Sequence, residues 1–284
     1  MAIPLVWMLI FFYFPMYGVI VAFKNFRILK GIRGSTWVGL REFERLFGSY
    51  QFWNIVRNTL VIAIVKVGFA FPAPIVLAIA LNEMRIVRLK KTIQTISFAP
   101  HFISTVVMAG MILTFLDPRF GFIGFFFRLF NSEAISLIAN PVYFPFIYAT
   151  TEIWQHAGFS AVIYIAALSS VDTELYDAAK IDGASKMQKI AHIDFPSIRS
   201  TIIIILILEI GNVMTLGFEK VFLLQNPLNL RSSEIIATYV YKVGLVNANY
   251  SFGAAVDLFN GVVNLILVAT ANIISRKLSE TSLW

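Results

Sequence analysis

Repeated long apolar runs constrain this chain more than any other feature. A helix needs roughly 18 to 20 apolar residues to cross the hydrocarbon core of a bilayer, and several runs in the sequence exceed that length. Only 14% of the 284 residues are charged, against about 25% in soluble domains. We therefore predict an all-α integral membrane protein, a single transmembrane domain of about six helices at residues 3–23, 54–81, 96–116, 142–170, 197–224 and 252–274.

Several residues within and between these runs carry further structural signals. Pro72 and Pro74 predict a kink in the second span, and Pro100 an early interruption of the third, because proline removes a backbone donor. The Phe-rich stretch 120–130 suits a helix lying in the membrane interface, and apolar residues recur at helical spacing in 233–243. The first run lacks a basic n-region, so we expect a transmembrane helix there and not a cleaved signal peptide.

Composition excludes some kinds of site. The chain contains no cysteine, so it has no disulfide, thiolate metal site or thiol nucleophile. His101, His156 and His192 show no shared metal-ligand spacing, and we predict no metal site. The formal net charge of +7 is expected to meet lipid headgroups, and we predict no nucleic-acid partner.

The connection between the fourth and fifth predicted spans, residues 172–196, is longer and more polar than a turn requires. Asp172 or Thr173 can N-cap a short helix, and Gly183 suits the left-handed position that ends one. Ser185, with a glutamine three residues later, has capping-box spacing for a second helix. These residues predict two short helices joined at a glycine.

Basic residues do not settle which side of the membrane this loop faces. They concentrate in short cytoplasmic loops, which favours the stretch 85–91 being inside, but the six basic residues of 24–45 would then lie outside. In that position they either attract an acidic saccharide or a binding protein, or simply touch lipid headgroups. The orientation therefore rests on the motif in the 172–196 loop.

Within that loop, Asp177-Ala178-Ala179 is followed by three residues, Gly183, nine residues, Ile193, one residue and Phe195-Pro196. This spacing resembles the EAA loop of binding-protein-dependent ABC importer permeases, with Asp177 in place of the usual Glu and Phe195 in place of the usual Leu. The resemblance implies the six-span type I importer permease fold, in which the loop is a cytoplasmic coupling helix that docks on an ATPase subunit. The coupling residues that it implies are Glu174, Tyr176, Asp177, Ala178, Ala179, Asp182 and Gly183.

The amino-acid sequence of the loop most resembles that of the sugar-importing branch of the family. The chain as a whole looks most like permeases for complex saccharides, including the acidic polysaccharide alginate. The resemblance implies a saccharide delivered by an external solute-binding protein, a second permease subunit that is a homologous but different chain, and a bacterial cytoplasmic membrane. It also implies two ATPase subunits that bind ATP and Mg. Since this chain has no G-x-x-x-x-G-K-[ST] phosphate loop, we expect it to hold no cofactor and to have no ATPase activity.

Polar side chains inside the predicted spans are candidates for the translocation path, because placing them against lipid is costly. Glu209 follows seven apolar residues and is expected to line a pore or to be paired. Glu152 either lies on the path or is solvated near the interface, and Asn260 and Asn264 either line the path or pack between helices. The candidate path residues are Glu152, Gln155, Glu209, Asn212, Asn260 and Asn264.

Three other functions are compatible with a multi-span chain. They are a permease for another solute, a membrane-embedded transferase and a secondary transporter. A transferase should show clustered acid, base or metal-binding residues at a membrane face, and a secondary transporter tends to show paired repeats. Neither feature is evident in the sequence, so the importer permease is the preferred hypothesis.

Overall fold

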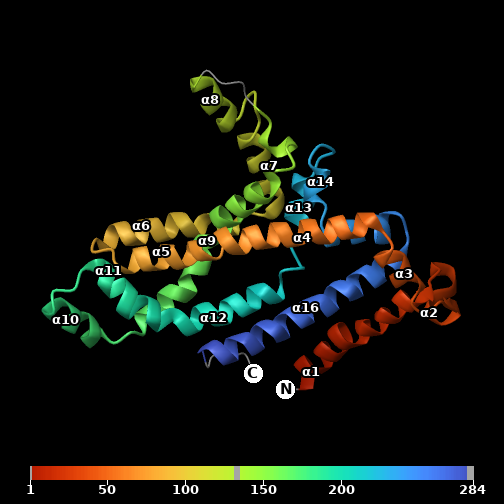
Figure 1. Cartoon of the computed structure of the whole chain (residues 1–284), viewed down its shortest axis with the longest axis horizontal. Helices are drawn as coiled ribbons and strands as arrows, with labels where there is room; N and C mark the ends of the chain where they lie inside the picture. The colour runs from red at the N-terminus through yellow and green to blue at the C-terminus, as the bar shows by residue number, and fades with distance from the viewer. Residues whose placement is uncertain (1, 131–134, 280–284) are drawn as a thin grey trace.

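The computed structural model describes residues 2–130 and 135–279, which form an elongated arrangement of helices (Figure 1). Three stretches of this part of the chain are long and apolar enough to cross a membrane: Ile3–Phe23, Tyr50–Asn82 and Tyr250–Lys277. They confirm the first, second and sixth predicted spans. A fourth is obtained if Val87–Phe102 and Thr105–Phe115 count as one bent span. The helices at the fourth and fifth positions do not meet the same criterion, so the total of six stays a prediction.

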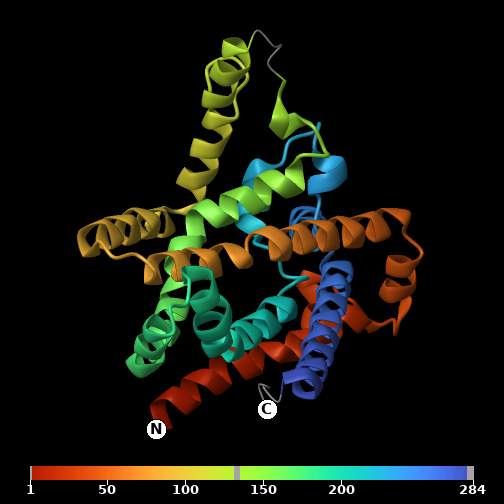
Figure 2. The same cartoon turned by 60° about the vertical axis from the view of Figure 1, so that its left-hand side comes forward.

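The first span is one continuous helical run made of α1 (Ala2–Met8), η1 (Leu9–Tyr13) and η2 (Phe14–Phe23). Its η2 part packs against α16 (Tyr250–Ser279), the long C-terminal helix (Figures 1 and 2). A short antiparallel pair follows, with Lys24 opposite Trp37. The elements of this segment are β1 (Lys24–Asn25), η3 (Ile28–Lys30), α2 (Gly31–Gly34), β2 (Thr36–Trp37) and α3 (Arg41–Phe47).

The second span breaks where the prolines predict a kink. Helix α4 (Tyr50–Phe69) ends just before Pro72, which opens α5 (Pro72–Asn82). Helix α9 (Phe144–Ser169) occupies the fourth predicted position and packs along both α4 and α5. Buried apolar side chains at these contacts form the centre of the molecule, among them Ile62, Ala63, Ala78, Phe144, Tyr148 and Tyr164.

The third span, predicted over 96–116 with an early interruption at Pro100, is sharply bent at that proline. The chain forms α6 (Val87–Phe98), η4 (Ala99–Phe102) and α7 (Thr105–Phe115), with a bend of 105° between the two helical parts. Pro100 lies in η4, and Ser104 then N-caps α7 by accepting from the backbone N–H of Val107 at 3.4 Å. A new cap at this point starts a helix in a new direction, and α7 projects away from the rest of the molecule together with α8 (Phe122–Leu129), ahead of η5 (Leu137–Ala139) (Figure 1).

The fifth span, predicted over 197–224, is also not a single helix. Helix α12 (Phe195–Gly211) ends early, and α13 (Phe218–Leu224) begins only after a non-helical break. Asn264 of α16 stabilises this break, because its Oδ1 accepts from the backbone N–H of Met214 at 3.2 Å and its Nδ2 donates to Thr215 Oγ1 at 2.7 Å. A tertiary contact therefore supplies the partner that a continuing helix would have given that N–H.

The remaining elements are two groups of short helices. In place of the amphipathic helix expected at 233–243, the chain forms α14 (Leu230–Ser233), α15 (Ile236–Val240) and η7 (Tyr241–Val246). Ile236 and Tyr239 of α15 are buried. The other group lies at one end of the molecule, here termed the α10 end, and consists of α10 (Thr173–Ile181), α11 (Lys186–Lys189) and η6 (Ile190–Asp194) (Figure 1). The end that contains α2, α3 and the start of α4 is termed the α3 end.

Candidate functional site

The 172–196 loop forms two short helices, as its capping residues predict. Asp172 is the N-cap of α10, and its side chain accepts from the backbone N–H of Glu174 at 2.9 Å. Ser185 and Gln188 form a complete capping box at the start of α11, which satisfies backbone donors at that helix end reciprocally. From there the chain continues through η6 into α12, with Pro196 in the first turn of that helix.

Gly183 is the joint between the two helices. Its φ is +69°, a left-handed conformation that glycine adopts without a Cβ penalty. Its N–H donates to the Lys180 carbonyl at 3.2 Å, and the N–H of Ala184 donates to the Ala179 carbonyl at 2.8 Å, the two bonds of a Schellman motif. A Cβ at Gly183 would meet no atom within 4 Å, so it is the backbone and not crowding that favours glycine here.

Most of the predicted coupling residues are exposed on the surface of α10 and at its C-terminal end. Tyr176 and Ala179 are half-buried, whereas the other members of that set are exposed. Leu175 and Ile181 expose 51% and 86% of their surfaces on the same short helix. Exposed apolar residues together with carboxylates at a free helix suit a protein partner better than solvent alone.

A group of five buried or half-buried polar residues, here termed the clasp, holds this loop against the end of α5. Tyr176 donates from its hydroxyl to Asp194 Oδ1 at 2.5 Å, and Asn82 donates to the same oxygen at 3.3 Å. Beside them, Lys189 Nζ pairs with Glu83 Oε1 at 3.0 Å. Asp194 is completely buried, so the loop is attached to α5 and η6 through partners that water does not replace.

Tyr176 is held in its donor form at this site. Burial, together with the hydrogen bond to Asp194, raises the pKa of Tyr176 to about 12. The hydroxyl is therefore protonated at neutral pH and can donate to the carboxylate.

A polar cavity of about 320 Å³ lies between α4, α5, α9 and α12. Its ionisable and hydroxyl-bearing lining residues are Lys66, Glu152, His156, Ser160, Tyr164 and Glu209. Tertiary packing thus gathers ionisable groups from three predicted spans around one hollow.

The charges at this cavity are paired across helices. Lys66 Nζ of α4 lies 3.1 Å from Glu209 Oε2 of α12. Lys220 of α13 forms an ion pair with Glu152; the Lys220 side chain is buried and that of Glu152 is 13% exposed. His156 contacts His101, with the two Nδ1 atoms 3.1 Å apart. Among the residues that the structure describes, no three His, Asp or Glu side chains are grouped to hold a metal ion.

Only two of the six predicted path residues line this cavity. Glu152 and Glu209 do so, whereas Gln155 donates to the Ile103 carbonyl at 3.2 Å and Asn212 donates back to its own helix, at the Leu208 carbonyl, at 3.0 Å. Asn264 is engaged at the break after α12. Asn260 of α16, the sixth member of the set, is buried, with 8% of its surface exposed. Their roles in transport stay predictions.

Sequence reasoning missed Lys66, although a signal for it was present. It is the only basic residue between positions 58 and 84, and an isolated lysine within an apolar run requires a partner or a water-filled space. The clasp gave no comparable signal, because Asn82, Glu83 and Asp194 stand in polar stretches where such residues are common.

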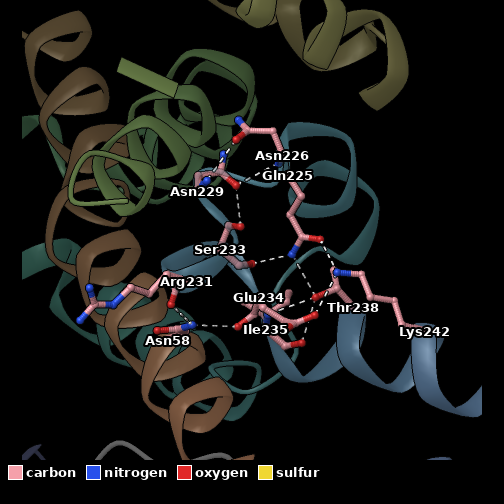
Figure 3. A network of polar contacts seen from close by, with 10 residues as sticks. All are labelled: Asn58, Gln225, Asn226, Asn229, Arg231, Ser233, Glu234, Ile235, Thr238 and Lys242. Carbon is pink, nitrogen blue, oxygen red and sulfur yellow. Dashed lines mark hydrogen bonds and ion pairs between the residues drawn. The ribbon is translucent and has the colours of Figure 1, made fainter. Parts of the chain in front are cut away.

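A second polar network connects the end of α13, the α14–α15 segment and Lys242 of η7 with α4 (Figure 3). Lys242 Nζ bonds Glu234 Oε1 at 2.9 Å and Gln225 Oε1 at 3.1 Å. Gln225 in turn donates to Thr238 Oγ1 at 3.2 Å, and Asn58 of α4 donates to the Glu234 carbonyl at 3.2 Å. These bonds fix the α13–α15 segment against α4.

One protein-family model matches almost the whole length of the chain. Residues 1–280 match the family model described as "Binding-protein-dependent transport system inner membrane component". The "Polygalacturonan/rhamnogalacturonan transport system permease protein YteP" of Bacillus subtilis (strain 168) is 41% identical over 279 residues, which is 98% of this chain and 87% of that protein.

Solved structures agree in fold over nearly the full length. A bacterial ABC transporter "involved in the import of the acidic polysaccharide alginate" contains a chain with TM-score 0.91 and 36% identity, and the match covers 97% of this chain and 93% of that chain. The bacterial alginate ABC transporter "in complex with alginate pentasaccharide-bound periplasmic protein" gives TM-score 0.92 and 36% identity, covering 100% and 95% of the two chains.

Proposed function

The chain belongs to the family of binding-protein-dependent transport system inner membrane components, and on that premise we propose that it forms part of the import path for a saccharide. The proposed substrate is an oligo- or polysaccharide with acidic sugars. Two of its similar proteins are named for such chains, polygalacturonan in one case and alginate in the other. An external binding protein delivers the substrate to the α3 end, and the α10 end faces the cytoplasm.

The observation that carries the coupling part of this proposal is the geometry of α10. The helix is short, exposed on its coupling residues, and attached at its other side to α5 and η6 through the clasp. In the proposed mechanism two separate ATPase subunits bind and hydrolyse ATP with Mg, and one of them receives α10. A displacement of α10 then moves the ends of α5 and α12 with it.

The polar cavity is the proposed segment of the translocation path within this subunit. Its wall brings together two carboxylates, a lysine, a histidine and a tyrosine, all of which exchange hydrogen bonds with sugar hydroxyls. The pairing of Lys66 with Glu209 keeps both charges satisfied when no sugar is present. A second permease subunit, homologous but different, supplies the facing wall.

Reconstitution of the complete complex tests this function. The chain is co-expressed with the second permease and the ATPase subunits, placed in liposomes, and assayed for ATP hydrolysis with binding protein and oligogalacturonate. We expect hydrolysis to rise only when protein and sugar are both present. Failure of the chain to co-purify with any ATPase would refute the importer role, whereas stimulation by a different solute alone would refute the saccharide assignment.

A further inference from the structure

A recess at the α3 end combines features that no other part of the described chain shows together. It has a volume of about 380 Å³ and lies between the first two turns of α4 and the short helix α14. Its wall contains two guanidinium groups, three amides, an exposed phenol and one carboxylate, from Arg57, Arg231, Gln51, Asn54, Asn58, Tyr50 and Glu234. Most of its lining is polar, unlike a surface prepared for lipid.

The recess is held in shape by bonds between its two walls. Asn58 of α4 donates from Nδ2 to the carbonyl of Arg231 at 2.9 Å and to that of Glu234 at 3.2 Å (Figure 3). At the next residue of α4, Thr59 Oγ1 accepts from the backbone N–H of Ile236 at 3.1 Å. The position of the α14 wall is therefore fixed to α4 by three hydrogen bonds, of which the one to Ile236 is buried and the one to the Arg231 carbonyl is exposed.

The recess carries a net positive charge. Its carboxylate, that of Glu234, is already paired with Lys242 at 2.9 Å. Among the described residues, neither Arg57 nor Arg231 has an acidic partner within ion-pair distance, and both side chains are exposed. In Figure 3 the Arg231 guanidinium extends away from the Glu234–Lys242 pair.

We propose that this recess binds a uronate unit, a sugar ring that carries a carboxylate, before the chain enters the polar cavity. Guanidinium groups bind carboxylates through two parallel hydrogen bonds, and Arg57 and Arg231 are the free donors. Asn54 offers an amide to sugar hydroxyls. Tyr50 is 83% exposed and offers an apolar ring face to the C–H side of a sugar.

This site rests on the proposed saccharide function, and it adds that acidic sugars are selected at the outer end of the permease itself. The arginines of the recess would act on a substrate in a different way from the basic residues of 24–45 at the same end of the molecule. Those residues give a long-range field, whereas a pair of free guanidiniums in a fixed hollow recognises one carboxylate at short range.

The test is equilibrium binding to the assembled permease–ATPase complex in nanodiscs, without the binding protein. The probes are labelled trigalacturonate and a neutral galactose trisaccharide. We expect Arg57→Gln and Arg231→Gln each to weaken trigalacturonate binding by about tenfold, the loss of one hydrogen-bonded contact between charged groups. Arg33→Gln removes one exposed charge at the same end without touching the recess, and should bind like the parent.

Three outcomes would overturn the site. The first is an equal loss of trigalacturonate binding in Arg33→Gln, and the second is binding of the neutral trisaccharide as tight as that of trigalacturonate. The third is loss of trigalacturonate binding only in nanodiscs with phosphatidylglycerol, which would assign the recess to a lipid headgroup. Sugar-dependent ATP hydrolysis separates this result from the parent function. If trigalacturonate stimulates the parent complex and the double arginine variant alike, the recess is refuted while the importer stands.

Discussion

Removal of the Tyr176 hydroxyl should loosen the coupling loop without unfolding the protein. In Tyr176→Phe, Asp194 remains fully buried and keeps only the amide of Asn82, at 3.3 Å, on its Oδ1. Its other carboxylate oxygen has no hydrogen-bond partner among the described residues even in the parent. A hydrogen bond to a charged group contributes roughly 1.5 to 3 kcal/mol, so local opening of α10 should become easier by about 2 kcal/mol, or roughly thirty-fold.

Hydrogen exchange followed by mass spectrometry measures that opening directly. We expect the amides of α10 to exchange about thirty-fold faster in Tyr176→Phe, and binding protein to stimulate ATP hydrolysis less at an unchanged KM for ATP. Lys180→Gln is the matched control on the same helix, because it breaks the exposed pair with Asp177, in which both side chains are about two-thirds exposed. Exposed pairs contribute about 0 to 1 kcal/mol. Equal exchange rates in Tyr176→Phe and the parent would refute the clasp.

Three further predictions address other parts of the fold. Gly183→Ala should cost about 1 kcal/mol, because alanine is strained at positive φ although space is open there; exchange of α10 should rise and transport should fall, with membrane insertion unchanged. Gly158→Ala should lower the unfolding temperature in detergent sharply, since a Cβ there would overlap the backbone of Ser97, whereas Gly261→Ala, with open space around it, should not. Lys66→Met should destabilise the protein by leaving Glu209 unpaired. Adding Glu209→Gln should restore the unfolding temperature but not transport. Recovery of uptake in the double variant would argue against the cavity as the translocation path.

Local chemistry explains which features could be predicted from the sequence. The caps at Asp172 and Ser185 and the left-handed Gly183 involve residues at most five positions apart. Such interactions depend on spacing along the chain and not on what packs nearby. The apolar runs behave in the same way, because bilayer thickness sets their length.

The break in the fifth predicted span depended on a tertiary contact, whereas Pro100 marked the break in the third. Apolar composition continues through much of the fifth, so hydropathy gave no reason to interrupt 197–224. What ends α12 is the crossing of α16, where a Cβ at Gly211 would overlap Val268 and where Asn264 takes up the free backbone N–H of Met214.

The polar sites show most clearly the difference between what local sequence sets and what tertiary packing sets. The sequence alone determined the apolar runs of a membrane protein and the two short helices of the 172–196 loop, since both follow from local patterns. Only the tertiary structure paired Lys66 with Glu209, 143 positions apart, and Asn82 with Asp194, 112 positions apart. The physical reason is that a buried charge must find a partner wherever the folded helices bring one within reach, and that distance is a property of packing and not of the chain.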